Sequence, residues 1–555
     1  MFLTARKHLL RCVSLGFSLL SFALLSEAQN ITGRIVANGK PLKGVVVSDG
    51  VEVTTTDGNG HYELQSGKEN GYVFYSLPRG YEPAYSRGFL PRIWSPLNSK
   101  DVSTDEVHDF ELLRLKGSTD KYVMLFGADV HLAKRNDDLK QFDGFLSALE
   151  RERERAGKRA VHTMFLGDIS WDNYWTSMKF GLPELVDFLE QSRYPVPMWP
   201  VMGNHDHDPS IPDGTQTDVL SAGVWRKVMG PNYYSFNLGR VHYVVLDDIV
   251  YKNEDTGGKY RKGVVGSRNY DAVLTKEQLD WLEKDLAMVQ DKNAPLIIAV
   301  HIPVWKLDYM TLKTSARLKQ GTAERLGDIL RPFKQVHIVS GHVHVNYTAR
   351  PEAYPNITEH NIAAICATWW RTGKLSGHHV GKDGSPGGYS RWEIDGNRIR
   401  YAYCSFDKGD SDQMRIYDMN TVAKAYREDP FFVQMMKQKT RRTDYGSLPA
   451  NTVMVNVFAY DTDWKVEILE DGKPIPYERV VDEDPLQTLA MDYAKYLSDG
   501  KFVETAAGTK TYHLFRAQAT TADRPITVRV TDSFGRKYEQ TSQRPIPYEL
   551  NSLSK

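Results

Sequence analysis

Five short apolar segments in the middle of the chain each lead into a polar run that contains Asp, Asn or His. Their length and lack of alternation are typical of buried strands. The segments are 122–126, 161–166, 196–202, 295–300 and 336–339, and the runs after them are Asp129-Val-His131, Gly167-Asp168, Gly203-Asn204-His205-Asp206, His301 and Gly341-His342-Val-His344. Because open α/β sheets place their sites at the carboxyl ends of the strands, we expect the five runs to meet at one edge.

Two segments between these strands, 141–156 and 275–290, have the apolar spacing of helices. In the second, Leu279, Leu282 and Leu286 recur at helical intervals. Thr275, three residues before Gln278, is a capping-box signature. The alternation of strands and helices indicates an α/β layered domain.

The polar runs supply two Asp, one Asn and five His side chains as candidate metal ligands. This set can hold two divalent metals and leaves one His for proton transfer or charge stabilisation. The set contains no Cys, so Mn, Fe or Zn suits it better than a metal that seeks thiolates. A lone His is more often structural than a ligand, but all five runs in order favour a two-metal hydrolase.

Between Lys121 and His379 these motifs make the chain resemble the calcineurin-like metallophosphoesterase family. The resemblance implies a β-sandwich flanked by helices, with a dinuclear site at one edge. It implies a first metal held by Asp129, His131 and His344, a second held by Asn204, His301 and His342, Asp168 as the bridge between them, and His205 as the catalytic His. A hydroxide bound to two metals would then attack a phosphate ester, and His205 would stabilise or protonate the leaving oxygen.

The run Gly167-Asp-Ile-Ser-Trp171-Asp172 departs from the family pattern. Many members place an Asp that orients the catalytic His one position earlier, so the sequence leaves open whether Asp172 reaches His205. In the purple acid phosphatase branch, the position of Trp171 would be a Tyr bound to ferric iron. Trp cannot make that bond, and we therefore predict a protein without the purple colour.

Two further segments are candidates for contact with substrate. His207 continues the Asn-His-Asp loop and could line the pocket, although a solvated loop would have the same sequence. Trp369-Trp370-Arg371 follows the apolar segment 362–367 and could present an aromatic wall with a phosphate-binding Arg. The alternative is a packed Trp pair with a surface Arg.

Residues 1–28 are typical of a secretory signal peptide. Arg6, Lys7 and Arg11 precede an apolar run at 13–25, and Ser26-Glu-Ala28 offers small residues for cleavage. Cys12 lies ahead of the apolar run, which argues against a lipoprotein anchor, and no later segment approaches the about 20 apolar residues of a membrane span. We therefore expect a soluble protein, secreted or periplasmic.

Composition narrows the possible partners. The chain has 70 basic and 70 acidic residues, and a net charge near zero gives no reason to expect a nucleic acid partner. The partner implied by the resemblance is the phosphate-ester substrate. The sequence implies no obligate protein partner. Cys366 and Cys404, the cysteines left after processing, could form one disulfide or remain free.

The flanks of the phosphoesterase-like part predict β-rich modules. Residues 29–115 contain short alternating strands and an Asp57-Gly-Asn-Gly60 turn, and they resemble the carboxypeptidase-regulatory-like β-sandwich. We expect the catalytic domain at 116–380 and a C-terminal β-rich domain at 381–555, with some helix at 486–498. The leading hypothesis is an exported two-metal phosphoesterase. The alternative is an inactive relative whose β-sandwiches bind glycan or protein.

Overall fold

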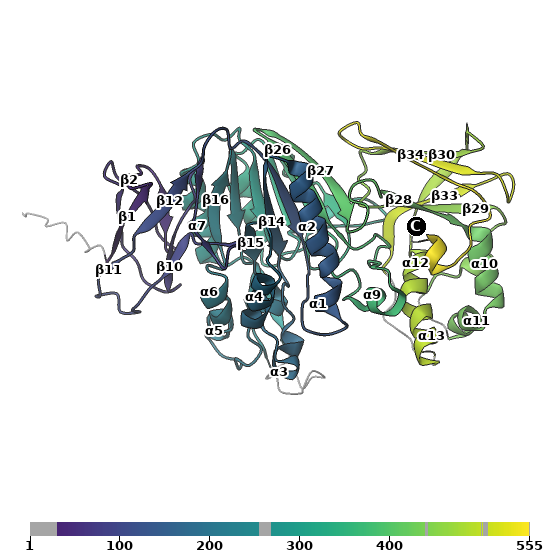
Figure 1. Ribbon diagram of the computed structural model, residues 1–555, viewed down its shortest axis with the longest axis horizontal. Coiled ribbons are helices and arrows are strands. Elements are labelled where there is room, and N and C mark those ends of the chain that lie inside the picture. Colours follow the sequence, from purple (N-terminus) through teal and green to yellow (C-terminus); the bar gives the residue numbers. More distant parts are fainter. Residues whose placement is uncertain (1–29, 255–267, 439–441, 501, 503–508, 554–555) are drawn as a thin grey trace, which may run out of the picture.

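The computed structural model describes residues 30–254, 268–438, 442–500, 502 and 509–553. The signal peptide predicted at 1–28 lies outside these residues. A central layered region is flanked by a β-rich N-terminal region on one side and a β-rich C-terminal region on the other (Figure 1). The mixed α/β fold class predicted from the sequence is confirmed.

Two sheets form the central region. The first has the order β15 (Met198–Val201), β14 (Ala160–Leu166), β13 (Lys121–Gly127), β26 (Gly388–Asp395), β27 (Arg398–Ser405). The second has the order β16 (Tyr234–Leu238), β17 (Val241–Val245), β20 (Leu296–Ala299), β23 (Val336–Ser340), β25 (Ile357–Asn361), β24 (Tyr347–Ala349). In the first sheet β13, β14 and β15 are parallel, and in the second β17, β20, β23 and β25 are parallel. The five predicted strands therefore exist, with their carboxyl ends at the same edge.

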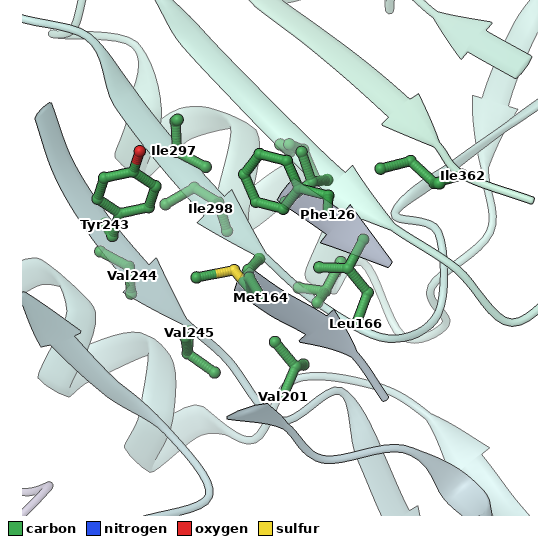
Figure 2. Close-up of a cluster of buried hydrophobic side chains, with 14 of the residues drawn as sticks. Phe126, Met164, Leu166, Val201, Tyr243, Val244, Val245, Ile297, Ile298 and Ile362 are labelled. Atoms are coloured by element: carbon green, nitrogen blue, oxygen red, sulfur yellow. The ribbon is translucent and has the colours of Figure 1, made fainter. Parts of the chain in front are cut away.

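The two sheets pack face to face through apolar side chains. Figure 2 shows Phe126, Met164 and Leu166 from the first sheet beside Val244 and Ile298 from the second. These five side chains are fully buried, and burial of one such side chain stabilises the fold by about 1.5–3 kcal/mol. The contact between the sheets therefore fixes the edge that both share.

Helices cover the outer faces of this sandwich. The central helices are α1 (Asp138–Gln141), α2 (Asp143–Ala156), α3 (Trp175–Met178), α4 (Leu182–Gln191), α5 (Thr217–Ser221), α6 (Gly223–Val228), α7 (Lys276–Ala287), α8 (Thr322–Leu330) and α9 (Arg371–Ser376). On β13, Val123 and Leu125 belong to the apolar cluster of α2, α4 and α6, whereas the alternate residues face the other sheet. Both faces of β13 are thus covered, which explains its unbroken apolar sequence.

A capping box has two hydrogen bonds, and at the start of α7 one of the two is present. Thr275 Oγ1 accepts a hydrogen bond from the Gln278 backbone N–H at 3.3 Å. The Gln278 side chain turns inward instead of returning to the cap, and it pairs with both backbone groups of Asp247 at 2.7 and 2.8 Å. Gln278 therefore joins α7 to the loop after β17.

Two short hairpins complete the central region: β18 (Ile249–Tyr251) with β19 (Tyr270–Ala272), and β21 (Trp305–Leu307) with β22 (Thr314–Ala316). Within the described residues, no helix combines the length and apolar character needed to cross a membrane.

The N-terminal region consists of two sheets and a separate strand pair. The first sheet contains β1 (Ile31–Ala37), β2 (Lys40–Pro41), β5 (His61–Leu64), β7 (Tyr81–Glu82), β11 (Glu106–Val107) and β12 (Phe110–Arg114); the second contains β3 (Val46–Ser48), β4 (Val53–Thr55), β6 (Tyr72–Tyr75) and β10 (Trp94–Pro96); the pair is β8 (Tyr85–Ser86) with β9 (Leu90–Pro91). Trp281 of α7 donates from Nε1 to Ser48 Oγ at 3.0 Å, and Tyr233 donates to the Gly50 carbonyl at 2.8 Å. The region therefore packs on α7 and on the segment before β16.

The C-terminal region also contains two sheets. They are β28 (Met414–Asp418), β29 (Thr452–Val457), β33 (Thr511–Gln518) and β32 (Tyr477–Asp482), and β31 (Lys473–Pro474), β30 (Lys465–Glu470), β34 (Ile526–Thr531) and β35 (Lys537–Ser542). Its helices are α10 (Met419–Glu428), α11 (Pro430–Lys437), α12 (Pro485–Thr488), α13 (Ala494–Asp499) and α14 (Leu550–Leu553), with a π-helical turn at Leu489–Tyr493. Arg350 at the end of β24 joins this region to the centre through two hydrogen bonds to Asp461, at 2.8 and 2.7 Å.

The sequence placed the hairpin of β26 and β27 in the wrong part of the molecule. We expected the C-terminal module to begin at 381, yet β26 pairs with β13 over the register Lys121↔Asp395 to Phe126↔Ser390. The hairpin therefore completes the first central sheet. The error arises because the pairing joins segments more than 260 residues apart, and no local pattern reports it.

Candidate metal centre

The five polar runs meet at the shared edge of the two sheets. Their residues bend sharply out of the strands, and five of them have backbones in the left-handed region: Asp129 (φ 52), His131 (φ 49), Asp168 (φ 50), His342 (φ 68) and His344 (φ 61). This region is unfavourable for residues with a Cβ, and such strain is characteristic of functional sites. The strained turns bring side chains from separate strands together.

Two glycines of these runs permit the close approach. A Cβ on Gly167 would lie 2.3 Å from His301 Nδ1, and a Cβ on Gly203 would lie 2.2 Å from the Asp168 backbone nitrogen. Both distances are far below van der Waals contact. Glycine is therefore needed for the loops after β14, β15 and β20 to approach one another.

One half of the site is built by Asp129, His131 and His344. The Nε2 atoms of the two His lie 3.2 Å apart, and Asp129 Oδ1 lies 3.2 Å from His344 Nε2 and 3.9 Å from His131 Nε2. All three side chains are buried. Burial holds the pKa of His131 well below its usual value, so the imidazole is neutral, as a metal ligand must be.

The other half is built by Asn204, His301 and His342. His301 Nε2 lies 3.1 Å from Asn204 Oδ1 and 3.1 Å from His342 Nδ1. Burial would lower the pKa of His301, but the Asp168 carboxylate outweighs it and raises that pKa to about 10. A proton on His301 and a bound cation are alternative ways of placing positive charge beside Asp168, and a metal ion would take the place of that proton.

Asp168 lies between the two halves. Its Oδ2 is 3.7 Å from His131 Nε2 and 3.3 Å from His301 Nε2, while its Oδ1 accepts a hydrogen bond from the His205 backbone N–H at 2.7 Å. One carboxylate oxygen of Asp168 thus faces His131 in the first half and His301 in the second. This is the position expected of a bridging ligand.

The residues present fit two divalent metal ions. In each half, ring nitrogens of two His lie about as close as a hydrogen bond, with a carboxylate or amide oxygen beside them. Asp129 Oδ1 is buried and, within the described residues, makes no hydrogen bond. Buried polar atoms normally have a hydrogen-bond partner, and a coordinated cation would take the place of that partner for Asp129 Oδ1. Nitrogen and oxygen donors suit Mn, Fe or Zn.

His205 is held by Asp172, which answers the question left open by the sequence. The two side chains form a 2.6 Å hydrogen bond between His205 Nδ1 and Asp172 Oδ1. Burial alone would lower the pKa of His205, but the charges of Asp168 and Asp172 raise it to about 9. His205 also retains 27% of its side-chain exposure, whereas Asp172 has none.

Asp206 fastens the loop of His205 to the loop of Asp168. Its carboxylate accepts hydrogen bonds from the backbone N–H groups of Ile169, Ser170 and Gly203, at 3.2, 2.8 and 3.0 Å. The last residue of the Gly-Asn-His-Asp run therefore orients both loops.

The two predicted substrate-binding residues differ in their placement. His207 is fully buried, with its ring stacked on Tyr251 at 4.7 Å and its Nδ1 bonded to the Gly203 carbonyl at 3.1 Å. This placement is that of a packing residue and not of a substrate contact. Arg371 begins α9 and is partly buried, which leaves its predicted role open to test.

Sequence reasoning missed a thiol next to the first half of the site. Cys366 lies close enough to His131 and His344 that one potential ligand atom from each residue falls within 4.8 Å of the others. Both Cys366 and Cys404 are free and buried, so the disulfide considered from the sequence does not form. Cys366 gave no signal because it lies in an apolar segment remote from the His runs.

Comparison with known proteins places the site in a family. The protein-family model described as calcineurin-like phosphoesterase matches residues 123–346. Models described as the N terminal and the C terminal of calcineurin-like phosphoesterase match residues 29–115 and 359–538.

Individual relatives are distant. Purple acid phosphatase 15 of Arabidopsis thaliana is 27% identical over 161 residues, which make up 28% of this chain and 26% of that protein. The match thus spans about a quarter of the relative's length. Among solved structures, a dimetal phosphatase from Danio rerio is 16% identical and is matched over 52% of this chain and 97% of its own, with a TM-score of 0.33. A purple acid phosphatase from yellow lupin (Lupinus luteus) is 14% identical over 66% of this chain and 68% of its own, with a TM-score of 0.34.

The three family models follow one another along most of the chain, and the central one spans all the predicted metal ligands. The chain belongs to the calcineurin-like phosphoesterase family.

Proposed function

We propose that this protein is an exported hydrolase that cleaves a phosphate ester with the help of two divalent metal ions, Mn, Fe or Zn. The observation that supports this most strongly is the position of Asp168, whose Oδ2 faces His131 at 3.7 Å and His301 at 3.3 Å. A carboxylate shared by two separate ligand groups is the arrangement that a two-metal site needs.

Each half of the site would hold one metal. In this proposal Asp129, His131 and His344 bind the first ion, Asn204, His301 and His342 bind the second, and Asp168 binds both. When bound, the two ions supply positive charge to the phosphoryl oxygens and lower the pKa of water at the site. The strained, buried ligand loops keep the donors in place before substrate arrives, so little reorganisation is needed during the reaction.

His205 would act on the leaving group. Its Nδ1 donates to Asp172 at 2.6 Å, which fixes the ring and leaves Nε2 for substrate. A protonated His205 can donate a hydrogen bond or a proton to the oxygen that departs from phosphorus. Asp172 stabilises that protonated form by its charge, and Asp206 holds the backbone of the same loop.

The test is hydrolysis of paired aryl phosphate monoester and diester substrates by the chain that begins at Gln29. The protein is first treated with a chelator, and Mn, Zn or Fe is then added while metal content is measured. We expect turnover only with metal, at about two ions per chain. Metal-independent turnover, or full metal loading without turnover of either ester, contradicts the proposal.

Export is the second part of the proposal and rests on residues 1–28. The test is expression of the full chain in a Gram-negative bacterial host, followed by fractionation and N-terminal sequencing. We expect periplasmic protein that begins at Gln29. Uncleaved protein confined to the cytoplasm contradicts export without affecting the proposed chemistry.

A further inference from the structure

Three cationic side chains beside the metal centre have no carboxylate partner among the described residues. Arg135, Arg371 and Lys382 are partly buried, and within the described part of the chain none of them forms an ion pair with a carboxylate. Several buried cations elsewhere in the protein are paired with carboxylates, such as Lys68 with Glu106 at 2.8 Å and Arg544 with Asp418 at 3.2 Å. Because taking an unpaired charge out of water costs free energy, three such cations in one place require an explanation.

Arg135 lies against two aromatic rings, and one of these rings packs on a predicted metal ligand. Its guanidinium carbon lies 4.5 Å from the centre of the Tyr174 ring and 5.7 Å from that of Trp171, and it also donates a hydrogen bond to the Tyr174 hydroxyl. The Trp171 ring in turn lies 5.1 Å from that of His131, a predicted metal ligand. The aromatic faces support the cation but do not neutralise it.

Arg371 is held near Arg135. Asn136, next to Arg135, donates from Nδ2 to the Trp369 carbonyl at 3.3 Å, which joins the two loops. Burial lowers the pKa of Arg371, and the charge of Arg135 lowers it further. Two guanidinium groups are thus placed within electrostatic reach of each other, an arrangement that an anion would stabilise.

Lys382 completes the group on the side of His344. Its Nζ lies 4.4 Å from the centre of the Trp369 ring, and that ring lies 4.8 Å from the His344 ring. Each end of the cationic group therefore connects to the first half of the metal centre through one tryptophan.

The C-terminal region holds the loop that carries Lys382. Asn456 of β29 donates to the Asp383 carbonyl at 2.8 Å, and Arg415 of β28 donates to the Gly384 carbonyl at 2.6 Å. Helix α9, which begins at Arg371, also lies between the central and C-terminal regions (Figure 1). The C-terminal region thus shapes the surroundings of the metal centre.

We propose that Arg135, Arg371 and Lys382 form a second anion site, which binds another phosphate group of the substrate while the scissile phosphate occupies the metal centre. This inference rests on the proposed function. Arg binds phosphate oxygens through two parallel hydrogen bonds, and Lys adds a point charge. The enzyme would thus prefer esters that carry two phosphate groups over the matching monophosphate.

The kinetic test compares 1,3-propanediol monophosphate with 1,3-propanediol bisphosphate, using the full metal-loaded enzyme. We expect kcat/KM to be at least about tenfold higher for the bisphosphate, because charge-assisted hydrogen bonds to phosphate are strong. Arg371→Gln should reduce this ratio toward the statistical advantage of having two cleavable phosphates. Lys374→Gln is the matched control on the same helix, since Lys374 already pairs with Asp137 at 2.9 Å, and it should leave the ratio unchanged.

A binding measurement separates this inference from the proposed function. Isothermal titration of the metal-free full chain should show tighter binding of the bisphosphate than of the monophosphate, and Arg371→Gln should remove the difference. If no ester is hydrolysed but this preference remains, the anion site stands and the proposed function fails. If both esters are hydrolysed and the wild-type protein binds and cleaves them equally well, the anion site is wrong. Arg135→Gln and Lys382→Gln, on two other loops, repeat the test if Arg371→Gln does not fold.

Discussion

The Asp172 carboxylate binds His205 Nδ1 at 2.6 Å even though the loop between Asp168 and Asp172 is one residue longer than the family pattern. The extra residue is accommodated because Asp172 starts a short 3₁₀ turn, Asp172–Tyr174, that directs its buried carboxylate back toward the site. Arg268 Nε lies 3.7 Å from the other carboxylate oxygen. A carboxylate that orients His205, the predicted catalytic His, is therefore present at a shifted position.

This pair predicts the effect of changing Asp172 to Asn. The amide keeps the shape but not the charge, so His205 is oriented less well and its protonated form is less stable. We expect kcat to fall by about 10- to 100-fold, as for other residues that orient an active group, with both metals retained. Steady-state kinetics and metal analysis check this, and an unchanged kcat would show that Asp172 is only structural.

Changing His205 to Ala should lower kcat by about 10²–10⁴-fold for a poor leaving group. The loss should be smaller for an aryl ester whose leaving oxygen needs no proton, because His205 is assigned to that oxygen. Metal content should stay near that of the wild type. Loss of one or both metals in this variant would instead mean that His205 is a ligand.

Replacing Asp168 with Asn should disrupt the centre itself. The Oδ2 atom of Asp168 faces both His131 and His301, so the Asn side chain should weaken both proposed metal sites with one change. We expect a reduced metal content and loss of most activity. Asp247→Asn is a suitable control, because Asp247 is also buried but bonds to Asn232 at 2.7 Å and is not among the predicted ligands. Near-normal turnover by Asp168→Asn with both metals bound would refute the bridging role.

Much of this centre could be predicted because its signals are local. β13 and β14 are buried on both faces, so β13 appears in the sequence as an unbroken apolar run and β14 as a mostly apolar one, and a predicted ligand follows each strand end. The positions of Asp129 and Asp168 follow directly from that pattern. Glycines such as Gly203 lie where the loops touch, and they were visible within the same motifs.

Other features depend on contacts between distant segments. Cys366 lies near His131 across more than 230 residues, and β26 joins β13 across an even longer separation. Lys382 lies by the metal centre on a loop that Asn456 and Arg415 of the C-terminal region help to hold. Neither periodicity nor motif spacing contains this information, and the sequence-based prediction therefore contained none of these contacts.

Trp171 predicts the colour of the iron-loaded protein. Its ring packs 5.1 Å from the His131 ring, beside the first half of the centre. The indole has no oxygen to bind ferric iron, so no phenolate-to-iron charge-transfer band should arise from this position. We expect the protein loaded with ferric iron to lack an intense visible band. An absorption spectrum recorded with measured iron content checks this, and a strong purple colour would contradict it.

The neighbouring His337 and His360 predict a loss of stability in acid. Their rings stack at 5.2 Å, and His337 Nδ1 lies 3.0 Å from His360 Nε2. Burial lowers the pKa of His337 to about 4 and holds that of His360 well below its usual value. In the unfolded chain each His titrates near pH 6.5, so between pH 6.5 and 4 the unfolded state binds more protons than the folded state. The free energy of unfolding must then fall as the pH falls through this window, by up to about 3 kcal/mol for His337 alone.

We expect urea unfolding of the metal-free protein to show this trend, and His337→Gln to reduce the difference in unfolding free energy between pH 7 and pH 4.5. An identical pH dependence in the wild type and the variant would mean that His337 is not held neutral in the folded protein.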